Sequence, residues 1–332
     1  MASKIHFISH IEKTYEAVNL GDWICSPYTY YSTYFSEYTC VFHSHWSILW
    51  HEIDKGDVVI LGGGGQLDNS DALNNQINRI LRNCDNVVIW GSGTHRYAPG
   101  NIFNKNTAEV PILYDKAKLI GVRDYDHPSG LPYLPCVSCM HPAFMQGTAQ
   151  PIKIRRKIGT IRSALETSFA VSGLPSFVDN SQPLEKIIEY VLESEIILVS
   201  SYHGAFWSQL LGKRVVLPES RLCVDKYKYF KNKPAFYPGS DYDEAALISH
   251  TDNSVSSSGF LDECRQMSNS FFSKVADLIQ ATLVKPDQSD IQTVPILAKR
   301  NAQLEFSLRE AWSFVKQMNH RLSKLEKGMT KE

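Results

Sequence analysis

Short apolar runs alternate with amphipathic segments along the first half of the chain. Four of these runs have the length and the β-branched content of buried strands. Between the second and the third run, residues 71–82 carry apolar side chains at helical spacing. A strand, a helix and a strand in this order predict a parallel βαβ unit, so we expect an α/β domain. The four runs lie at residues 5–8, 57–61, 87–90 and 118–122.

The same alternation restarts after a stretch rich in proline and cysteine at residues 131–144. Its clearest unit is the apolar run 196–199, the helical segment 202–211 closed by Gly212, and the apolar run 214–217. The sequence therefore predicts a second α/β unit. Further strands are expected at 157–161 and 176–179, and further helices at 164–172, 183–194 and 271–283.

These patterns divide the chain into three parts. We place one boundary near residue 150, which gives a first domain at 1–150 and a second at 151–284. Residues 285–332 are expected to form a polar linker and a final helix. In that helix, apolar residues from Leu304 to Leu325 alternate spacings of four and three, as in a heptad seam. The seam is compatible with a homo-oligomer through the 304–325 helix and with docking on its own domain.

Composition indicates an ordinary globular protein of 332 residues, 43% hydrophobic and 21% charged. A formal net charge of −1 provides no general attraction to nucleic acid or to an anionic membrane, so we expect neither as a partner. Anion binding must then come from local clusters. One such cluster is the basic run at 153–157, which is equally well explained as a solvated linker surface.

The N-terminus has no apolar core of signal-peptide length, and no window approaches the roughly 20 apolar residues of a membrane span. We therefore expect no membrane span and a cytoplasmic protein. Seven scattered cysteines do not suggest a disulfide framework. Cys136, Cys139 and His141 form half of a zinc motif without a second half, so no metal and no cofactor are expected.

Candidate chemistry lies where the predicted strands end. Glycine-rich segments at 62–65 and 91–93 follow two successive strands, and Arg123 follows the next. Glycines let the backbone approach a ligand closely, and an arginine can donate two parallel hydrogen bonds to a carboxylate or phosphate. Ligands of α/β proteins bind at such strand ends. A structural ion pair of Arg123 with Asp124 or Asp126 is the alternative.

His203 lies in the first turn of the helix at 202–211 and is the first candidate for catalysis. An imidazole suits proton transfer near neutral pH, and the helix N-terminus favours its neutral form. The alternative is a histidine that caps its own helix. A carboxylate among Asp22, Asp68 and Asp124 is expected to act as the base, and the sequence does not choose between them.

Together, these motifs resemble the polysaccharide pyruvyltransferase family over roughly residues 5–218. Members of that family transfer a pyruvyl group from phosphoenolpyruvate to a sugar hydroxyl. The resemblance implies an α/β fold of two Rossmann-like domains in a GT-B-like arrangement, here with a C-terminal helical tail, and a transferase of surface polysaccharide synthesis. The motifs that carry it lie at residues 19–22, 62–65, 91–93, 122–124, 142–144 and 200–212.

Two positions depart from the family pattern and leave the donor open. Ser201 replaces the arginine that contacts the donor two residues before the histidine, and His141 replaces the aspartate before Pro-Ala-Phe. The alternative is a GT-B-type glycosyltransferase with a nucleotide-activated sugar donor. For it, Ser200-Ser201 and His141-Pro142 resemble short motifs of bacterial sialyltransferases, which bind a CMP sugar. A non-catalytic carbohydrate- or nucleotide-binding protein is the alternative from another class.

These considerations define one expected site. Its small-molecule partners are phosphoenolpyruvate or a nucleotide sugar as donor, and a saccharide as acceptor. The expected catalytic residues are His203, Arg123 and Asp22. The expected donor-binding residues are Gly63, Gly64, Gly65, Gly91, Ser92, Gly93, His141, Ser200, Ser201, Tyr202 and Gly204.

Overall fold

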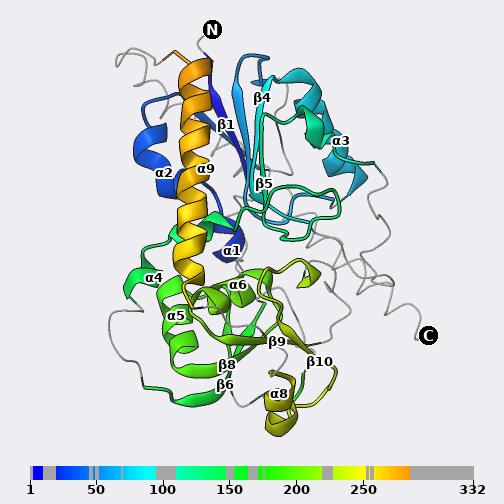
Figure 1. Ribbon diagram of the computed structural model, residues 1–332, viewed down its shortest axis with the longest axis vertical. Coiled ribbons are helices and arrows are strands. Elements are labelled where there is room, and N and C mark those ends of the chain that lie inside the picture. The colour runs from blue at the N-terminus through cyan, green and yellow to red at the C-terminus, as the bar shows by residue number, and fades with distance from the viewer. Residues whose placement is uncertain are drawn as a thin grey trace, which may run out of the picture.

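The computed structural model contains two parallel sheets of five strands each, one above the other in Figure 1. This architecture is consistent with the GT-B-like pair of α/β domains that the sequence implies. The expected helix at 164–172 lies almost wholly outside the described residues, and the tail at 285–332 lies entirely outside them. The structure describes residues 3–9, 20–44, 48, 52–68, 70–94, 110–146, 153–163, 171–174, 176–218, 227–251, 254 and 258–284.

The first sheet has the strand order β2-β1-β3-β4-β5, and neighbouring strands are parallel. Every residue of β1 and β3 is buried, because helices cover both faces of the sheet. The strands are β1 Ile5–Ser9, β2 Cys40–Ser44, β3 Val58–Gly62, β4 Asn86–Ser92 and β5 Leu119–Val122.

Three helices pack on this sheet. Helix α3 (Asp71–Asn83) places its apolar side against one face, while α2 (Tyr28–Phe35) and α9 (Phe260–Thr282) cover the other. The hydroxyl of Ser70 caps α3 by accepting a hydrogen bond from the backbone N–H of Leu73, which fixes where the helix begins.

The second sheet has the order β10-β9-β8-β6-β7 and is also parallel. Helices α5 and α6 pack on one face and α8 on the other. The elements are β6 Arg156–Arg162, β7 Val178–Asp179, α5 Leu184–Leu192, β8 Ser194–Val199, α6 Tyr202–Leu210, β9 Arg214–Pro218, β10 Ala235–Tyr237 and α8 Glu244–His250.

Further short helical segments connect the elements of both halves. No helix among the residues described above is both long and apolar enough to cross a membrane. The short segments are α1 Leu20–Trp23, η2 Tyr114–Lys116, η3 Val137–Met140 and α4 Ala143–Gln146.

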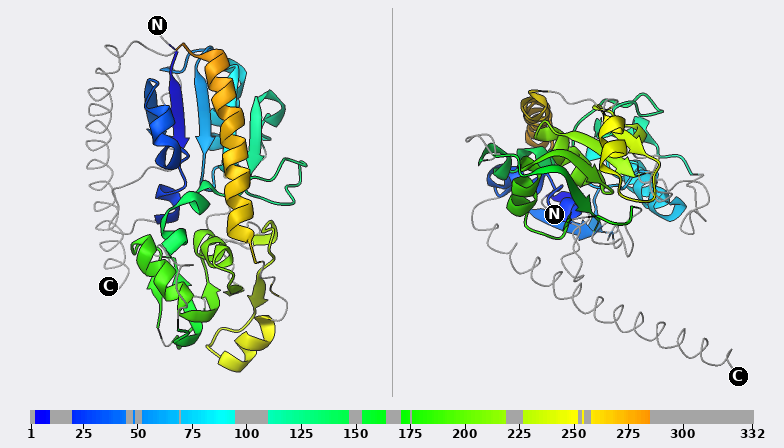
Figure 2. Two further views of the ribbon diagram at one scale, coloured as in Figure 1. Left: turned by 60° about the vertical axis from the view of Figure 1, so that its left-hand side comes forward. Right: turned by 90° about the horizontal axis from the view of Figure 1, so that it is seen from below.

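Helix α9 runs along both halves of the molecule (Figures 1 and 2). Its first residues, including Phe260 and Cys264, belong to the core around α5 and α6, and its last turns, including Val275 and Ile279, pack on the first sheet. The prediction that this helix begins at residue 271 is wrong, because it begins at Phe260. The additional turns connect the second half of the chain to the first.

The strands predicted from apolar runs are confirmed in both sheets, with ends that shift by one or two residues. The observed elements that were not predicted include β2, β10 and α8. Strands β2 and β10 contain only three consecutive apolar residues each, and α8 is a single short helix of seven residues, so none of them has an apolar pattern long enough to predict a strand or a helix.

Candidate functional site

The carboxyl ends of the two sheets meet at the centre of the molecule. Arg123 directly follows β5, and Tyr202 opens α6 just after β8. The guanidinium carbon of Arg123 lies 3.7 Å from the centroid of the Tyr202 ring. Residues 79 positions apart in sequence therefore lie together, at the strand ends where α/β proteins bind ligands.

Arg123 is buried, with 4% of its surface exposed. Its Nε and Nη1 atoms have no hydrogen-bond partner among the described residues. Gly93 makes room for this side chain, because a Cβ atom there would lie 2.4 Å from Nε. Burying a guanidinium without hydrogen-bond or ionic partners costs roughly several kcal/mol of folding free energy. An anion bound at this point would remove that cost.

The guanidinium of Arg123 stays charged. Burial lowers the pKa of Arg123, but Tyr202, Asp124, Cys136 and Cys25 together raise it by more, so the net shift is upward. In the part of the chain that the structure describes, no carboxylate lies within ion-pair distance of Arg123. Asp126 instead lies 3.4 Å from Lys233. The alternative prediction, a structural ion pair of Arg123 with Asp124 or Asp126, is therefore not observed among the described residues.

Asp124 lies beside Arg123 and is also buried. Its Oδ2 atom accepts a hydrogen bond from the backbone N–H of Thr94 at 2.6 Å, while Oδ1 has no partner among the described residues. Burial raises the pKa of the Asp124 carboxyl, and Arg123 opposes that rise. A carboxyl with a raised pKa and an open oxygen is suited to accept a proton.

His203 is enclosed by side chains and backbone from both halves of the chain, with 3% of its surface exposed. A Cβ atom on Gly21 would lie 2.0 Å from Nδ1, so α1 rests directly on the imidazole. Nε2 lies 3.6 Å from the sulfur of Cys136. The expected alternative, a histidine that caps α6, is not observed, because Ser201 is the cap and accepts from the N–H of Gly204 at 3.1 Å.

The glycine-rich segment after β3 packs against the chain itself. A Cβ atom on Gly63 would lie 2.1 Å from the carbonyl oxygen of Cys25, and one on Gly62 would lie 2.6 Å from the ring of Pro27. Gly63 and Gly64 both have positive φ, of 76° and 72°. Their observed effect is to let the segment after α1 approach β3 closely, which sets the position of α1 over His203.

The second glycine-rich segment is shaped by similar contacts. The hydroxyl of Ser92 donates to the carbonyl of Leu61 at 3.3 Å. Gly91 has a φ of 63°, and a Cβ atom there would lie 3.2 Å from the carbonyl oxygen of Pro135. Of this segment, Gly93 is the residue whose missing side chain opens space for the functional candidate Arg123.

Three expected donor-binding polar residues have hydrogen-bond partners in the chain. Nδ1 of His141 accepts from the backbone N–H of Ala143 at 3.2 Å, and burial lowers the pKa of His141. The hydroxyl of Ser200 accepts from the N–H of Ser163 at 3.2 Å. Ser201 caps α6, as described above. These contacts stabilise turns and helix ends.

The expected carboxylates separate into two groups. Asp22 lies in α1 next to Gly21, and its charge raises the pKa of Cys25 after the larger effects of burial and Cys136. Asp68 lies beside α3, where its Oδ1 accepts from Asn74 at 3.5 Å. The geometry thus brings Asp22 and Asp124 to the site with His203 and Arg123.

The residues around Nε2 of His203 are a part of the site that the sequence did not reveal. The sulfur of Cys136 lies next to Nε2 of His203. Ser138 donates a hydrogen bond to that sulfur, and Trp207 donates to Ser138. The Cys-x-x-Cys spacing suggested only an incomplete zinc motif. No group of three metal-ligating side chains occurs among the residues that the structure describes.

The basic run at 153–157 forms ion pairs within the second half. Glu193 binds Arg155 at 2.9 Å and Arg156 at 2.8 Å, and Glu195 binds Lys157 at 2.6 Å. These contacts favour the structural interpretation of the run over an anion site.

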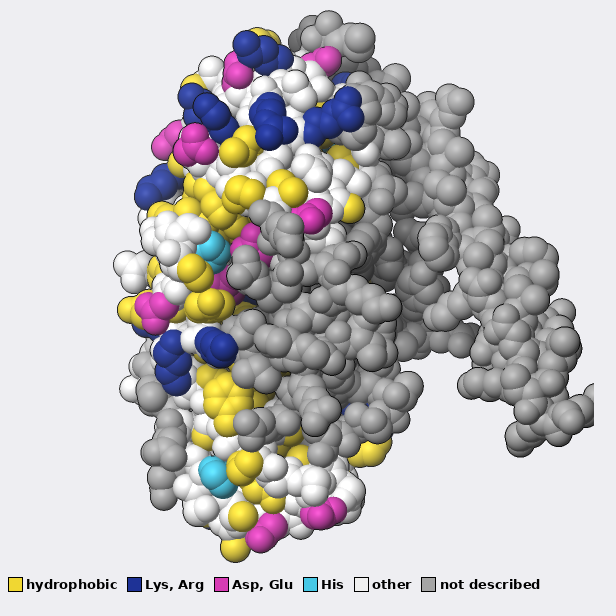
Figure 3. Space-filling model, turned by 90° about the vertical axis from the view of Figure 1, so that its right-hand side faces the viewer, with side chains coloured by type: hydrophobic (Ala, Val, Ile, Leu, Met, Phe, Trp, Pro, Cys, Tyr) yellow, Lys and Arg dark blue, Asp and Glu magenta, His cyan; other side chains and the backbone are white. Residues whose placement is uncertain are grey.

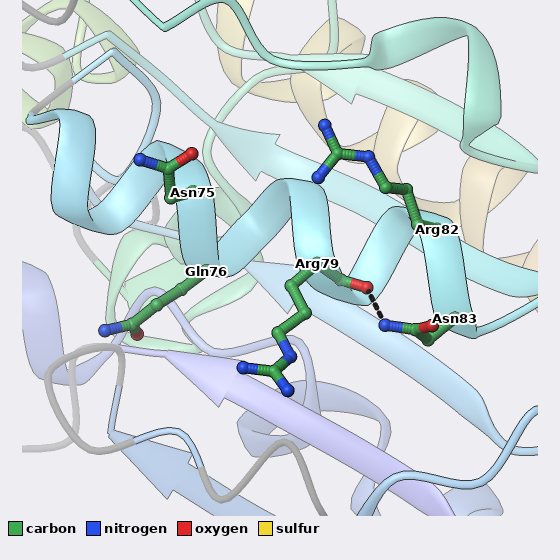
Figure 4. Close-up of a pocket in the computed structure, with 5 residues that line it drawn as sticks. All are labelled: Asn75, Gln76, Arg79, Arg82 and Asn83. Carbon is green, nitrogen blue, oxygen red and sulfur yellow. Dashed lines mark hydrogen bonds between the residues drawn. The ribbon is translucent and has the colours of Figure 1, made fainter.

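A separate pocket lies on the outer side of α3, away from the predicted site residues. Lys and Arg side chains gather at this end of the molecule in Figure 3. The pocket has a volume of about 450 Å³, and the described residues that line it all lie in α3 (Figure 4), where Asn83 donates to the Arg79 carbonyl at 2.8 Å. Its lining residues are Asn75, Gln76, Arg79, Arg82 and Asn83.

Comparisons with known proteins give no family assignment. No protein-family model matches the chain, and no curated protein matches it. A solved structure of the wall teichoic acid polymerase TagF is similar over 91% of this chain and 90% of that one, at 11% identity and a TM-score of 0.36. A histidine variant of TagF has 10% identity and a TM-score of 0.35 over 92% and 90%. TM-scores this low do not establish a common fold.

Proposed function

We propose that this protein is a GT-B-type glycosyltransferase that takes a nucleotide-activated sugar as donor and a saccharide as acceptor. The observation that supports the proposal is Arg123, a buried and charged guanidinium where the strand ends of the two sheets meet, with two nitrogens that have no hydrogen-bond partner among the described residues. A diphosphate or phosphodiester would satisfy this charge, because a guanidinium fork binds phosphate oxygens with two hydrogen bonds.

The neighbouring groups suit the transfer of a sugar from such a donor. A bond forms between the acceptor oxygen and the anomeric carbon of the donor sugar, while the bond from that carbon to the phosphate oxygen breaks. Arg123 stabilises the negative charge on the departing phosphate. Asp124, with its raised pKa, or Asp22 takes the proton of the acceptor hydroxyl.

Pyruvyl transfer from phosphoenolpyruvate is the second candidate. The two positions that depart from the pyruvyltransferase pattern, Ser201 and His141, make local hydrogen bonds here, which favours the glycosyltransferase proposal. One observation favours pyruvyl transfer. The guanidinium of Arg123 stacks on Tyr202, the residue after Ser201, so an arginine does reach the start of α6 from another element.

The test is to incubate the protein with a panel of nucleotide-activated sugars, CMP sugars included, and separately with phosphoenolpyruvate, each with and without saccharide acceptors. We expect nucleotide release that the acceptor stimulates. Phosphate release from phosphoenolpyruvate alone would select the second candidate. Donor binding without turnover across the panel would indicate a non-catalytic binding protein, and binding of neither donor class would refute the proposal.

Substitution of Arg123 connects the activity to the site. Arg123→Gln should lower kcat/KM by about tenfold or more, since a charge-assisted hydrogen bond contributes roughly 1.5–3 kcal/mol. Arg123→Lys should retain part of the activity, because it keeps the charge and loses the fork. Arg79→Gln, on the exposed side of α3, is the matched control and should leave the rate unchanged.

A further inference from the structure

A chain of hydrogen bonds connects two side chains of α6 through the segment η3. Nε1 of Trp207 donates to Oγ of Ser138 at 3.1 Å, and Oγ of Ser138 donates to the sulfur of Cys136 at 3.3 Å. The sulfur lies 3.6 Å from Nε2 of His203. All four residues are buried, so water does not compete for these contacts. Because His203 and Trp207 are one helical turn apart, η3 bridges one side of α6.

The chemistry of these groups gives the chain a direction. An indole N–H can only donate, so the hydroxyl of Ser138 must accept from Trp207 and pass its own single proton to the sulfur of Cys136. The sulfur then acts as an acceptor toward Ser138. The remaining proton of Cys136, on the thiol, has Nε2 of His203 as its neighbour.

The alternative arrangement is a thiolate beside an imidazolium. Burial raises the pKa of Cys136, although Arg123 and the hydrogen bonds from Ser138 act in the opposite direction, and the net shift is upward. A thiol with a raised pKa stays protonated at neutral pH. A neutral thiol has a proton to donate to Nε2 of His203, and an Nε2 that accepts this proton carries none of its own.

We propose that Cys136 is a positioning residue, whose thiol donates to Nε2 and holds His203 as the neutral tautomer with its proton on Nδ1. That nitrogen faces α1 at Gly21, where the enclosed space admits no side chain. On the proposed glycosyltransferase function, His203 is then a hydrogen-bond donor in the site. The acceptor proton goes to a carboxylate, and His203 does not take it.

Long-range ¹H–¹⁵N correlation spectra of protein labelled in its histidine rings test the tautomer directly. The signals of His203 are identified by their loss in His203→Gln. We expect a protonated Nδ1 and an unprotonated Nε2 at pH 7. A protonated Nε2, either as the other neutral tautomer or as imidazolium, would overturn the proposal without any substitution of Cys136.

Three variants separate positioning from packing. Cys136→Ser keeps a donor and should retain the Nδ1–H tautomer, whereas Cys136→Ala should shift the population toward Nε2–H. Cys139→Ala is the matched control, because Cys139 is as buried as Cys136 but its sulfur contacts Ser268. In this control the signals of His203 should not change. If Cys139→Ala shifts the tautomer as much as Cys136→Ala, the effect is general packing.

The spectra and the activity assay can refute the two proposals independently of each other. If no donor is turned over but the Nδ1–H tautomer is observed, the proposed function is wrong and the role of Cys136 stands. If turnover is observed with an Nε2–H tautomer, the function stands and the positioning role is wrong.

Discussion

Arg123 carries a buried charge that the described part of the protein compensates only in part. Stacking on the Tyr202 ring and the nearby Asp124 charge offset some of the desolvation, and Nε and Nη1 stay without hydrogen-bond partners. A buried charge that is compensated only in part costs stability in the free protein. The site therefore predicts opposite effects on stability and on function.

Arg123→Met should lower kcat/KM at least as much as Arg123→Gln. It should leave the free protein as stable as the wild type or more stable, by about 1–2 kcal/mol, because an apolar side chain of similar volume removes the desolvation cost. Urea unfolding without donor measures this. Arg265→Met is the control that should destabilise, since the guanidinium of Arg265 donates to the carbonyls of Cys139 and His141. A loss of stability in Arg123→Met equal to that of Arg265→Met would mean that Arg123 is structural.

At the scale of elements, a buried hydrogen-bonded group connects the amino ends of β1 and β3 to His43 of β2. Nε2 of His6 lies 2.9 Å from Oδ2 of Asp57, and Nδ1 of His6 lies 2.9 Å from Nε2 of His43. Oδ1 of Asp57 accepts from the backbone N–H of Lys4 at 2.7 Å, and Oδ2 accepts from the N–H of Asp54 at 2.8 Å. This group lies at the end of the sheet opposite Arg123.

Acid should weaken this connection between strands. Burial raises the pKa of the Asp57 carboxyl, but the hydrogen bonds from His6 and from two backbone N–H groups lower it by more, so the net shift is downward. A carboxyl whose folded pKa is lowered stabilises the fold above its unfolded value of about 3.9. That stability is lost as the pH falls through the folded pKa.

Asp57→Asn should therefore reduce the free energy of unfolding at pH 7 by about 2 kcal/mol. As the pH falls below about 4, the unfolded pKa of an aspartate, the free energy of unfolding should decrease less in the variant than in the wild type. Unfolding curves at a series of pH values measure both effects. Asp54→Asn is the control, because its side chain is exposed and its backbone N–H is unchanged. An unchanged pH slope in Asp57→Asn would show that Asp57 does not link acid to unfolding.

The elements also show how far the sequence predicts this structure. Fully buried strands such as Val58–Gly62 were predictable, because both of their faces require apolar side chains. The place of Arg123 at the end of a strand was predictable from the apolar run before it, and its role in a site stays a prediction. The cap formed by Ser201 and the thiol beside His203 were not, because they depend on local hydrogen bonds and on a contact between residues 67 positions apart.

At the scale of the whole molecule, the two halves share one core. The cluster around α5 and α6 includes Ile24, Cys136 and Phe144 from the first half of the chain. Helix α9 contributes to this cluster at its start and packs on the first sheet at its end. Because packed side chains connect both sheets, we expect the halves to unfold as one cooperative unit.

Ile279→Ala tests this cooperativity from a position that contacts only the core of the first sheet, where Ile279 is fully buried. Removing the side chain should cost about 2–4 kcal/mol. Hydrogen exchange followed by mass spectrometry should then show that the free energy of opening decreases by a similar amount in peptides from β3 and in peptides from β8. Gln280→Ala, on the exposed side of α9, should change neither. A loss confined to β3 would mean that the halves open separately, and the site between Arg123 and Tyr202 would then be the surface along which they part.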